Sequence, residues 1–430
     1  MGRHTKTSMT LSAALLVGTA IGANSAAAET ITVWSGFPEM VPFYEHVAAS
    51  MADDHPDLEV NVEAIALREH ERRIALGLTG GGQGTLVIEL AGSTAQRYIE
   101  NDLLPAVPDD VASFVTGDGN FSEFFINTAS DDGTVYGVPL FRGQGALFYN
   151  TDMFEAAGLS EPPATMADYT TYAEQLTERD ADGNPIVSGW SLRLSGGGQG
   201  IAEKFWINLF QFGGSVLEQT DDGMWQAGYA NEAGRNALNQ YLVNLYTLDT
   251  VTPEMPADAE AFQRGQTAMF IRESWVIGDI AARAPDLNYA TAPLPMGSIA
   301  LPVNLYVNEA DGDGADAAWA FAMAANEPDN LVWLLENVGW LPNRINVDYS
   351  SVTEAVPQFS AFVNNPAGFE FFTLPAIGPI EEVLTRLAAQ LEQAFADPSL
   401  ADDPEAIDAF LAAAAEETNR ILEREGLLAQ

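Results

Sequence analysis

Two kinds of hydrophobic pattern alternate along the first hundred residues of the chain. Short apolar runs at 30–34 and 85–90 predict buried strands, and the alternating segment 58–65 predicts a third strand. Apolar residues at helical spacing predict helices at 42–51 and 68–78, between those strands. Strands that alternate with helices are typical of an α/β unit built on a largely parallel sheet.

Two loops follow predicted strands of this sheet, at 35–39 and 91–94. Ligands of such sheets bind in the crevice beyond the carboxyl ends of the strands. We therefore take these loops as candidate binding loops. The residues selected from them are Ser35, Glu39, Gly92 and Ser93.

The remainder of the chain continues the mixture of strands and helices. Two extended runs, 135–139 and 146–149, flank the polar stretch 141–145. Helical patterns follow, with Gly-rich stops between them, and the last third from 315 onward is mostly helical. The predicted helices of the middle third span 166–176, 205–212, 231–248 and 258–265, with a strand at 267–271.

The N-terminus has the pattern of a secretory signal peptide. Arg3, His4 and Lys6 form a positive region, and the apolar stretch 9–22 is too short for a membrane span. Small residues at 25–28 suit a signal peptidase, so we expect residues 1–28 to be removed after Ala28. With no lipidated cysteine to tether the mature chain, the expected location is the periplasm, without membrane insertion.

Composition narrows the possible partners. The 430 residues include 61 Asp and Glu against 18 Lys and Arg, a formal charge of −43. Loss of Arg3 and Lys6 with the signal peptide makes it −43 − 2 = −45. Nucleic acid and anionic membrane surfaces need a basic face, so neither is expected as a partner. Cysteine is absent, which excludes disulfides and thiol catalysis.

A catalytic or metal-binding motif is not found in the sequence. The histidines at 46, 55 and 70 do not form a zinc-binding helix motif. The Gly-Gly-Gly-Gln-Gly segments at 80–84 and 196–200 lack the Lys-Ser/Thr of a P-loop, and no Gly-x-Ser-x-Gly elbow is present. We therefore expect no catalytic residues, no metal and no cofactor.

Aromatic residues beside chain breaks, and arginines at segment junctions, are more informative. Trp34, Trp206, Trp275 and Trp340 could stack on a sugar ring or pack in the core. Arg142, Arg272 and Arg344 could hold hydroxyls, a carboxylate or a phosphate, or form ion pairs with the many acids.

Several motifs, in order, carry a resemblance to a known family. They are Tyr136-Gly-Val-Pro139, the run Ala146 to Leu159 with Pro162-Pro-Ala-Thr165, Leu209 to Gly214, Phe262 to Met269 with Ser274-Trp275, and Gly339-Trp-Leu-Pro-Asn-Arg344. Together they resemble the extracellular solute-binding proteins of ABC importers, the family that includes maltose-binding proteins. Met166, Pro302-Val303 and Leu140 depart from the usual family pattern.

The resemblance implies a two-lobed periplasmic-binding-protein fold with ligand bound between α/β lobes. Lobe one would comprise 29–140 plus 304–341, and lobe two 141–303 plus 342–430. The crossovers would be 139–143, 301–306 and 340–343. Ligand would favour the closed state through hinge motion, and the closed monomer would dock on the permease subunits of an ABC importer.

The resemblance also implies further ligand contacts in the crossovers and in lobe two. Trp275 would stack on a sugar, and Arg142 would touch the solute from the first crossover. Hydroxyl, amide and carboxylate groups suit a sugar, and glycine allows close backbone approach. The remaining candidates are Gly143, Gly198, Gln199, Trp206, Ser274, Asn304, Arg344 and Glu381.

Three functions remain open from the sequence. The leading one is capture of a sugar or oligosaccharide for import. The first alternative is an anionic sugar or polyol phosphate read by arginines, which the net charge disfavours. The second is a secreted glycan-degrading enzyme that uses paired acids.

Overall fold

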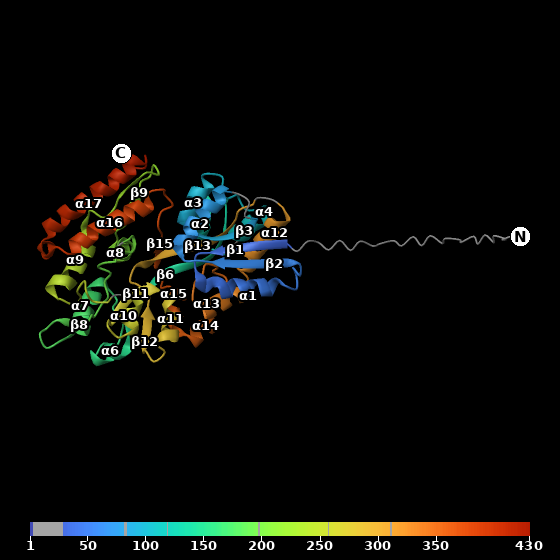
Figure 1. Ribbon diagram of the computed structural model, residues 1–430. Coiled ribbons are helices and arrows are strands. Elements are labelled where there is room, and N and C mark those ends of the chain that lie inside the picture. The colour runs from blue at the N-terminus through green and yellow to red at the C-terminus, as the bar shows by residue number, and fades with distance from the viewer. Residues whose placement is uncertain (3–28, 81–83, 118, 197, 257, 310–311) are drawn as a thin grey trace.

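The computed structural model describes residues 1–2, 29–80, 84–117, 119–196, 198–256, 258–309 and 312–430 (Figure 1). The predicted signal peptide falls, from residue 3 to residue 28, outside the described residues. In the described part of the chain, every helix is too short or too polar to cross a membrane.

One sheet runs through the molecule, with the strand order β11-β6-β13-β3-β1-β2. β1 is parallel to both β2 and β3, whereas β13 is antiparallel to β3 and to β6. β12 and β14 also pair with β6, and β15 pairs with β13. The strands are β1 (Glu29–Ser35), β2 (Leu58–Ala64), β3 (Thr85–Ala91), β6 (Val138–Asn150), β11 (Met269–Glu273), β12 (Tyr289–Ala292), β13 (Gly297–Val307), β14 (Leu341–Pro342) and β15 (Glu370–Phe372).

Helices cover this sheet and build a separate helical mass beside it. Figure 1 shows α1, α2, α3 and α12 around β1–β3 on one side, and α8, α9, α16 and α17 together on the other. The helices are α1 (Val41–Met51), α2 (Leu67–Gly80), α3 (Gly92–Ile99), α4 (Asp109–Thr116), α5 (Glu123–Thr128), α6 (Thr151–Ala156), α7 (Met166–Leu176), α8 (Gly200–Gln211), α9 (Glu232–Leu242), α10 (Ala259–Gln263), α11 (Val276–Arg283), α12 (Asp313–Ala324), α13 (Pro328–Asn337), α14 (Ser350–Ala355), α15 (Ser360–Val363), α16 (Ile380–Phe395) and α17 (Pro404–Arg424). Small two-stranded sheets are β4 (Ser130–Asp131) with β5 (Thr134–Val135), β7 (Glu178–Arg179) with β8 (Pro185–Val187), and β9 (Leu217–Gln219) with β10 (Trp225–Ala227).

The apolar run at 86–88 in β3 is explained by burial on both faces. Val87 packs into the cluster that contains α1 and α12, whereas Leu86 and Ile88 pack into a second cluster with Ile74 of α2. A strand buried on both faces is rich in apolar residues on both, and Glu89 is the buried charged exception in β3. This confirms the α/β class predicted from the pattern.

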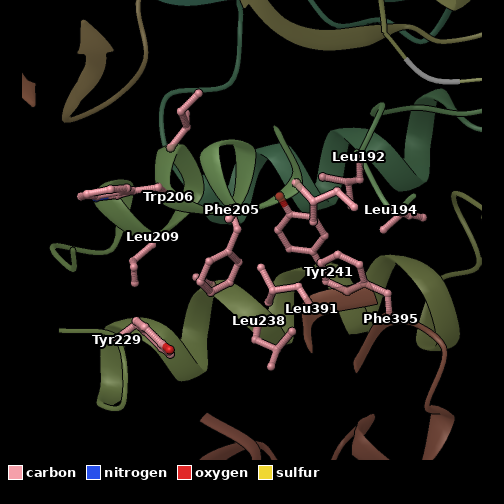
Figure 2. Packing of buried hydrophobic residues seen from close by; sticks show 14 of the residues in the cluster. Leu192, Leu194, Phe205, Trp206, Leu209, Tyr229, Leu238, Tyr241, Leu391 and Phe395 are labelled. Carbon is pink, nitrogen blue, oxygen red and sulfur yellow. The ribbon is translucent and has the colours of Figure 1, made fainter. Parts of the chain in front are cut away.

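The helical mass has its own core, shown in Figure 2. Phe205 of α8, Tyr241 of α9 and Phe395 of α16 meet there, and the Tyr241 and Phe395 rings stack with centroids 4.8 Å apart. Fully burying one such side chain stabilises the fold by about 1.5–3 kcal/mol. This core and the sheet cores make the two lobes that the fold class requires.

One element differs from its predicted extent. The extended runs at 135–139 and 146–149 were expected to be separate, but 138–150 form the single strand β6. The neighbouring strands β11 and β13 pair with β6 and keep it extended across Gly143 and Gly145. Gly145 N donates to Ser298 Oγ of β13 at 3.0 Å.

The three predicted crossovers lie side by side. Gly143 pairs with Leu301 in the β6–β13 ladder, and Phe141 pairs with Pro342 of β14. One core cluster contains both Val33 and Phe270, which the predicted boundaries assign to different lobes. The exact lobe ranges stay a prediction.

Candidate functional site

A cavity of about 570 Å³ lies where the two lobes face each other. Its walls come from α2, the β3–α3 junction, β6, β13, β11, the start of α8, and residues 373–381 before and within α16. This volume falls within the range typical of small-molecule sites.

The first wall is the junction of β3 with α3. α3 begins at Gly92, where an added Cβ would lie only 2.2 Å from the Thr128 carbonyl oxygen. The backbone of α5 therefore approaches so closely that only glycine fits. Ser93 and Thr94 follow in the first turn of the helix and line the cavity.

Behind this wall, Glu89 is a buried carboxylate that is 1% exposed. Its Oε1 accepts from Ser35 Oγ at 2.9 Å and from Gly36 N at 3.0 Å, and its Oε2 accepts from the Tyr44 hydroxyl. Burial raises the pKa of Glu89 to about 7, and the hydrogen bonds from its three neutral donors lower the pKa too little to offset this. The carboxylate fixes the loop after β1 to the end of β3.

The second wall carries a chain of ion pairs at the end of β11. Glu273 accepts from Lys204 of α8 at 3.2 Å and from Arg272 Nη1 at 2.6 Å. Arg272 Nε also donates to Asp258 at 2.5 Å. Burial alone raises the pKa of Glu273, but the two cations overcome it and lower the value to about 2.

Aromatic rings form the floor near the crossovers. Phe37, Phe141 and Trp340 lie with ring centroids 5.2–5.4 Å apart, and all three line the cavity. Trp340 Nε1 donates to Glu39 Oε1 at 3.2 Å, which fixes the indole plane. Such rings present an apolar face suited to a sugar ring.

The cavity is acidic. Of the described residues that line it, six are glutamates and three are arginines. Arg68 is held by Glu71 of its own helix at 3.0 Å, and it lies 4.0 Å from Glu381 of the opposite lobe. Arg272 is neutralised by Asp258 and Glu273. Among the described lining arginines, only Arg97, which bonds the Tyr98 hydroxyl, is left without a carboxylate partner for an anionic ligand to replace.

Five of the sequence-predicted residues line this cavity, in both lobes. They are Gly92, Ser93, Gly143, Gln199 and Glu381.

Other predicted residues support the walls through hydrogen bonds. Ser35 bonds Glu89, and Glu39 bonds Trp340. Asn304 Nδ2 donates to the Thr128 carbonyl at 2.9 Å, and Ser274 Oγ donates to the Gly339 carbonyl at 2.7 Å. Asn304 and Ser274 are fully buried. Ligand contact by these four residues stays a prediction.

Arg142 is buried in the first crossover. Its Nε donates to Gln144 Oε1 at 3.0 Å and its Nη1 to the Pro342 carbonyl at 2.6 Å. Its guanidinium also lies 5.3 Å from the Phe125 ring centre. Within the described part of the chain, no carboxylate lies within ion-pair distance of Arg142, so the ion pair that the sequence left open for this residue is not found there.

The last four predicted residues lie outside the lining of the cavity. Trp206 is 2% exposed and stacks on Phe372 in the core of the helical mass, at the edge of the group in Figure 2. Trp275 lies under the Arg272 guanidinium, 5.3 Å from ring centre to carbon. Arg344 donates to the Asn326 carbonyl, and Gly198 lies in an exposed loop with φ of 66°. Their roles in binding stay predictions.

Several cavity residues were missed by sequence reasoning. Glu273 ends a strand, but the strand-end rule was applied only to the first three strands. Glu203 follows a glycine-rich stretch in the first turn of α8, and Arg68 sits on an ordinary amphipathic helix. Only Glu273 had a positional signal that could have identified it.

A smaller cavity of about 240 Å³ lies deeper in the helical lobe, beside Trp190, Asn208 and Tyr241. The Lys204–Glu273 and Arg272–Asp258 pairs separate it from the larger one. The larger cavity is the candidate site, because both lobes and the crossovers contribute to it. Across the described residues, no group of three or more His, Asp or Glu is arranged to hold a metal.

Comparison with known proteins places this architecture in a family. A lactose-binding protein from Rhizobium radiobacter is 27% identical over 340 residues, 76% of this chain and 74% of the relative. The sugar-binding protein MalE from Xanthomonas citri has a similar structure, with a TM-score of 0.73, 20% identity, and coverage of 92% of this chain and 98% of that one. UgpB from Mycobacterium tuberculosis, solved in complex with glycerophosphocholine, has a TM-score of 0.73 and 18% identity, with coverage of 92% of this chain and 99% of that one.

The likeness in structure shows the two-lobed fold, and a family match identifies the chain. The sequence pattern of the family described as bacterial extracellular solute-binding protein matches residues 46–361, which is most of the chain. The chain therefore belongs to the bacterial extracellular solute-binding protein family.

Proposed function

We propose that this protein captures a neutral sugar or oligosaccharide in the interlobe cavity and delivers it to the permease of an ABC importer. The observation that carries the proposal is the cavity itself, which joins an aromatic floor to polar walls from both lobes. The protein acts as a periplasmic monomer, after removal of residues 1–28. It binds without covalent chemistry.

The lining suits a polyhydroxyl ligand. Trp340 and Phe37 offer apolar faces, while Ser93, Gln199 and Glu381 offer hydroxyl, amide and carboxylate groups. Sugars combine an apolar ring face with hydroxyls that both donate and accept, so they need both kinds of wall. The lactose-binding relative supports the same ligand class.

Closure follows from the way the lobes are joined. β6 pairs with both β13 and β14 beside the floor of the cavity. A ligand that contacts both walls favours the closed arrangement by the difference between its affinities for the two states. Closure then presents the two lobes together to the permease.

The charge of the cavity favours a neutral ligand over an anion. The arginines of the two walls, Arg68 and Arg272, already hold carboxylates. A phosphate or uronate would have to displace those partners and meet the remaining acids. The anionic alternative would need Arg97, which is exposed and is paired with the Tyr98 hydroxyl.

Thermal shift followed by calorimetry tests the proposal. Mature protein is screened with lactose, maltose, arabinooligosaccharides, glucuronate and glycerol 3-phosphate, and a tight ligand raises Tm by mass action. We expect binding of a neutral sugar with one site per chain, compaction in small-angle scattering, and no hydrolysis product. Sustained product release, or binding of the anions alone, would overturn the proposal.

Two tryptophans provide a matched comparison of stacking. Trp340→Ala removes a ring that lines the cavity, and we expect sugar binding to weaken by about 1–3 kcal/mol. The sequence-based prediction assigns the same role to Trp275. If Trp275→Ala leaves the affinity unchanged and only lowers Tm, Trp275 acts as a structural support for Arg272.

A further inference from the structure

Glu203 differs from the other glutamates of the cavity. It lies in the first turn of α8, it is half-buried, and it lines the cavity. Through its side chain it forms no hydrogen bond or ion pair with any other residue that the structure describes. Its backbone N–H donates to the Gln199 carbonyl, so the start of the helix fixes its position.

Each of the other five glutamates has an identified partner. Glu89 is bonded by three neutral donors, and Glu273 by two cations. Glu71 and Glu381 lie beside Arg68, and Glu100 accepts from Gln96. Among the described glutamates of the lining, Glu203 and Glu381 accept no hydrogen bond through the side chain, and Glu203 alone also has no cation within ion-pair distance.

The charges around Glu203 come from four elements and do not supply that donor. Lys204 is adjacent but bonds Glu273, and Arg68 faces Glu203 from α2 while bonding Glu71. Arg193 lies in the loop before α8, and Glu273 of β11 adds repulsion. Burial raises the pKa of Glu203 above its ordinary value, which agrees with an incompletely solvated carboxylate.

A half-buried carboxylate that is bonded by no protein group among the described residues loses part of its hydration, which costs folding free energy without a compensating partner. Hydroxyl groups of a bound ligand would supply the missing hydrogen-bond donors. Sugar hydroxyls donate hydrogen bonds to a carboxylate. An ionised uronate carboxylate or a fully ionised phosphate group has no proton to donate, and the negative charge of Glu203 repels it.

We propose that Glu203 is a specificity-determining residue that accepts hydrogen bonds from ligand hydroxyls and excludes anionic solutes. The inference rests on the proposed function and adds to it the residue that selects a neutral polyhydroxyl ligand over an anion. Discrimination comes from Glu203 on the second wall, and the cation that faces it from α2, Arg68, is already paired with Glu71.

The test compares Glu203→Gln with Glu232→Gln. Both variants remove one charge from the first turn of a helix, but Glu232 is solvent-exposed and lies outside the lining of the cavity. We expect Glu203→Gln to raise Tm without ligand, because an unpartnered charge is removed. We also expect it to weaken binding of the neutral sugar by about 10- to 100-fold, the scale of hydrogen bonds to a charged group. Glu232→Gln should change neither the Tm nor the affinity for the sugar.

The probes are galactose and lactose as neutral sugars, and galacturonate and glucuronate as their acidic counterparts. Wild-type protein should bind a neutral sugar at least tenfold more tightly than the uronates, and Glu203→Gln should narrow that ratio. A lower Tm for Glu203→Gln without ligand would assign Glu203 a structural role and overturn the inference. An unchanged sugar preference would also overturn it.

Failure of the proposed function has a different signature. If no neutral sugar binds the wild-type protein, the proposed transport function fails. The Tm values of the ligand-free variants still decide whether the Glu203 carboxylate destabilises the folded protein. Glu203→Asp, which keeps the charge and shortens the reach, serves as a second variant. It should lose affinity but keep the discrimination against uronates.

Discussion

The two walls of the cavity each contain a glutamate removed from water, and the two are stabilised in different ways. On the first wall, Glu89 has only neutral donors, and burial raises its pKa to about 7. On the second, Glu273 has Lys204 and Arg272, which lower its pKa to about 2 against the effect of burial.

The difference shows that burial alone does not decide the charge of a carboxyl group. Hydrogen bonds from neutral groups orient a carboxylate, but they do not repay the loss of hydration as two cations do. The first wall can therefore lose its charge near neutral pH, whereas the second keeps its charge down to strong acid. The following predictions test this contrast, from the largest expected effect to the smallest.

Replacing Glu273 should produce the largest effect. Glu273→Ala leaves Lys204 and Arg272 facing each other without their shared counter-charge, so we expect a loss of about 3–5 kcal/mol in the free energy of unfolding. Urea denaturation at pH 7 measures it. Because the folded pKa is depressed, the wild-type advantage is present above about pH 4.5 and is lost as pH falls toward 2.

An exposed ion pair provides the control for that experiment. Glu260 bonds Arg264 at 2.5 Å, with side chains 68% and 64% exposed. Glu260→Ala should change stability by no more than about 0.5 kcal/mol. Equal losses at both sites would show that the second wall gains nothing from its ion pairs.

Glu89 should give the opposite dependence on pH. Its folded pKa is raised, so the native state binds more protons than the unfolded state between about pH 4.5 and 7, and its contribution to stability falls as pH rises through that window. The full cost above pH 7 is on the order of 3 kcal/mol. Melting curves across this range for wild type and Glu89→Gln should converge at low pH and separate in favour of the variant above pH 7.

The Glu89→Gln comparison keeps the hydrogen-bonded loop largely intact, since the amide oxygen can still accept from Ser35 and Gly36. The exposed substitution Glu59→Gln controls for a general change of net charge. Parallel curves for wild type and Glu89→Gln would contradict the assignment of a raised pKa to this carboxyl group.

Two glycines distinguish the walls by backbone packing. Gly92→Ala would push a methyl group to 2.2 Å from the Thr128 carbonyl oxygen, so we expect a loss of about 1–3 kcal/mol from overpacking. Thermal unfolding of the ligand-free protein measures it. A neutral result would mean that α5 moves away from α3 easily.

Gly143→Ala should have the smallest effect on stability. Its added methyl group would lie 3.6 Å from both Glu273 and Trp340, which is ordinary contact, so Tm should stay within about 1 °C of wild type. The methyl group enters the cavity lining, and ligand affinity should fall while stability holds. Calorimetry with the sugar found in the screen checks this separation of binding from folding.

Periodicity predicted the elements of the fold well, because burial on both faces leaves a direct mark on the sequence. The apolar run of β3 and the spacing of α2 illustrate this. The single strand β6 was not predicted, because its continuity depends on partners that come much later in the chain. Turn-forming glycines dominated the local pattern there.

The site was predicted less completely, for a physical reason. Strand ends correctly brought Gly92 and Ser93 to the cavity lining, since chain direction fixes where a parallel strand ends. Aromatic type alone could not distinguish Trp206, which packs in a core, from Trp340, which lines the cavity. The ion chain of the second wall joins residues from three separate segments, and pairing of that kind has no local signature.

The register of the central sheet also bears on the order in which the molecule is made. Ala91 at the end of β3 pairs with Val303 of β13, so an edge of the first lobe stays open until most of the chain has left the ribosome. An unpaired strand edge is a template for wrong partners, and contacts between distant segments form slowly. An N-terminal fragment that ends before β13 would leave the edge of β3 unpaired throughout its lifetime. The first lobe is therefore open to aggregation through this edge until β13 pairs with it.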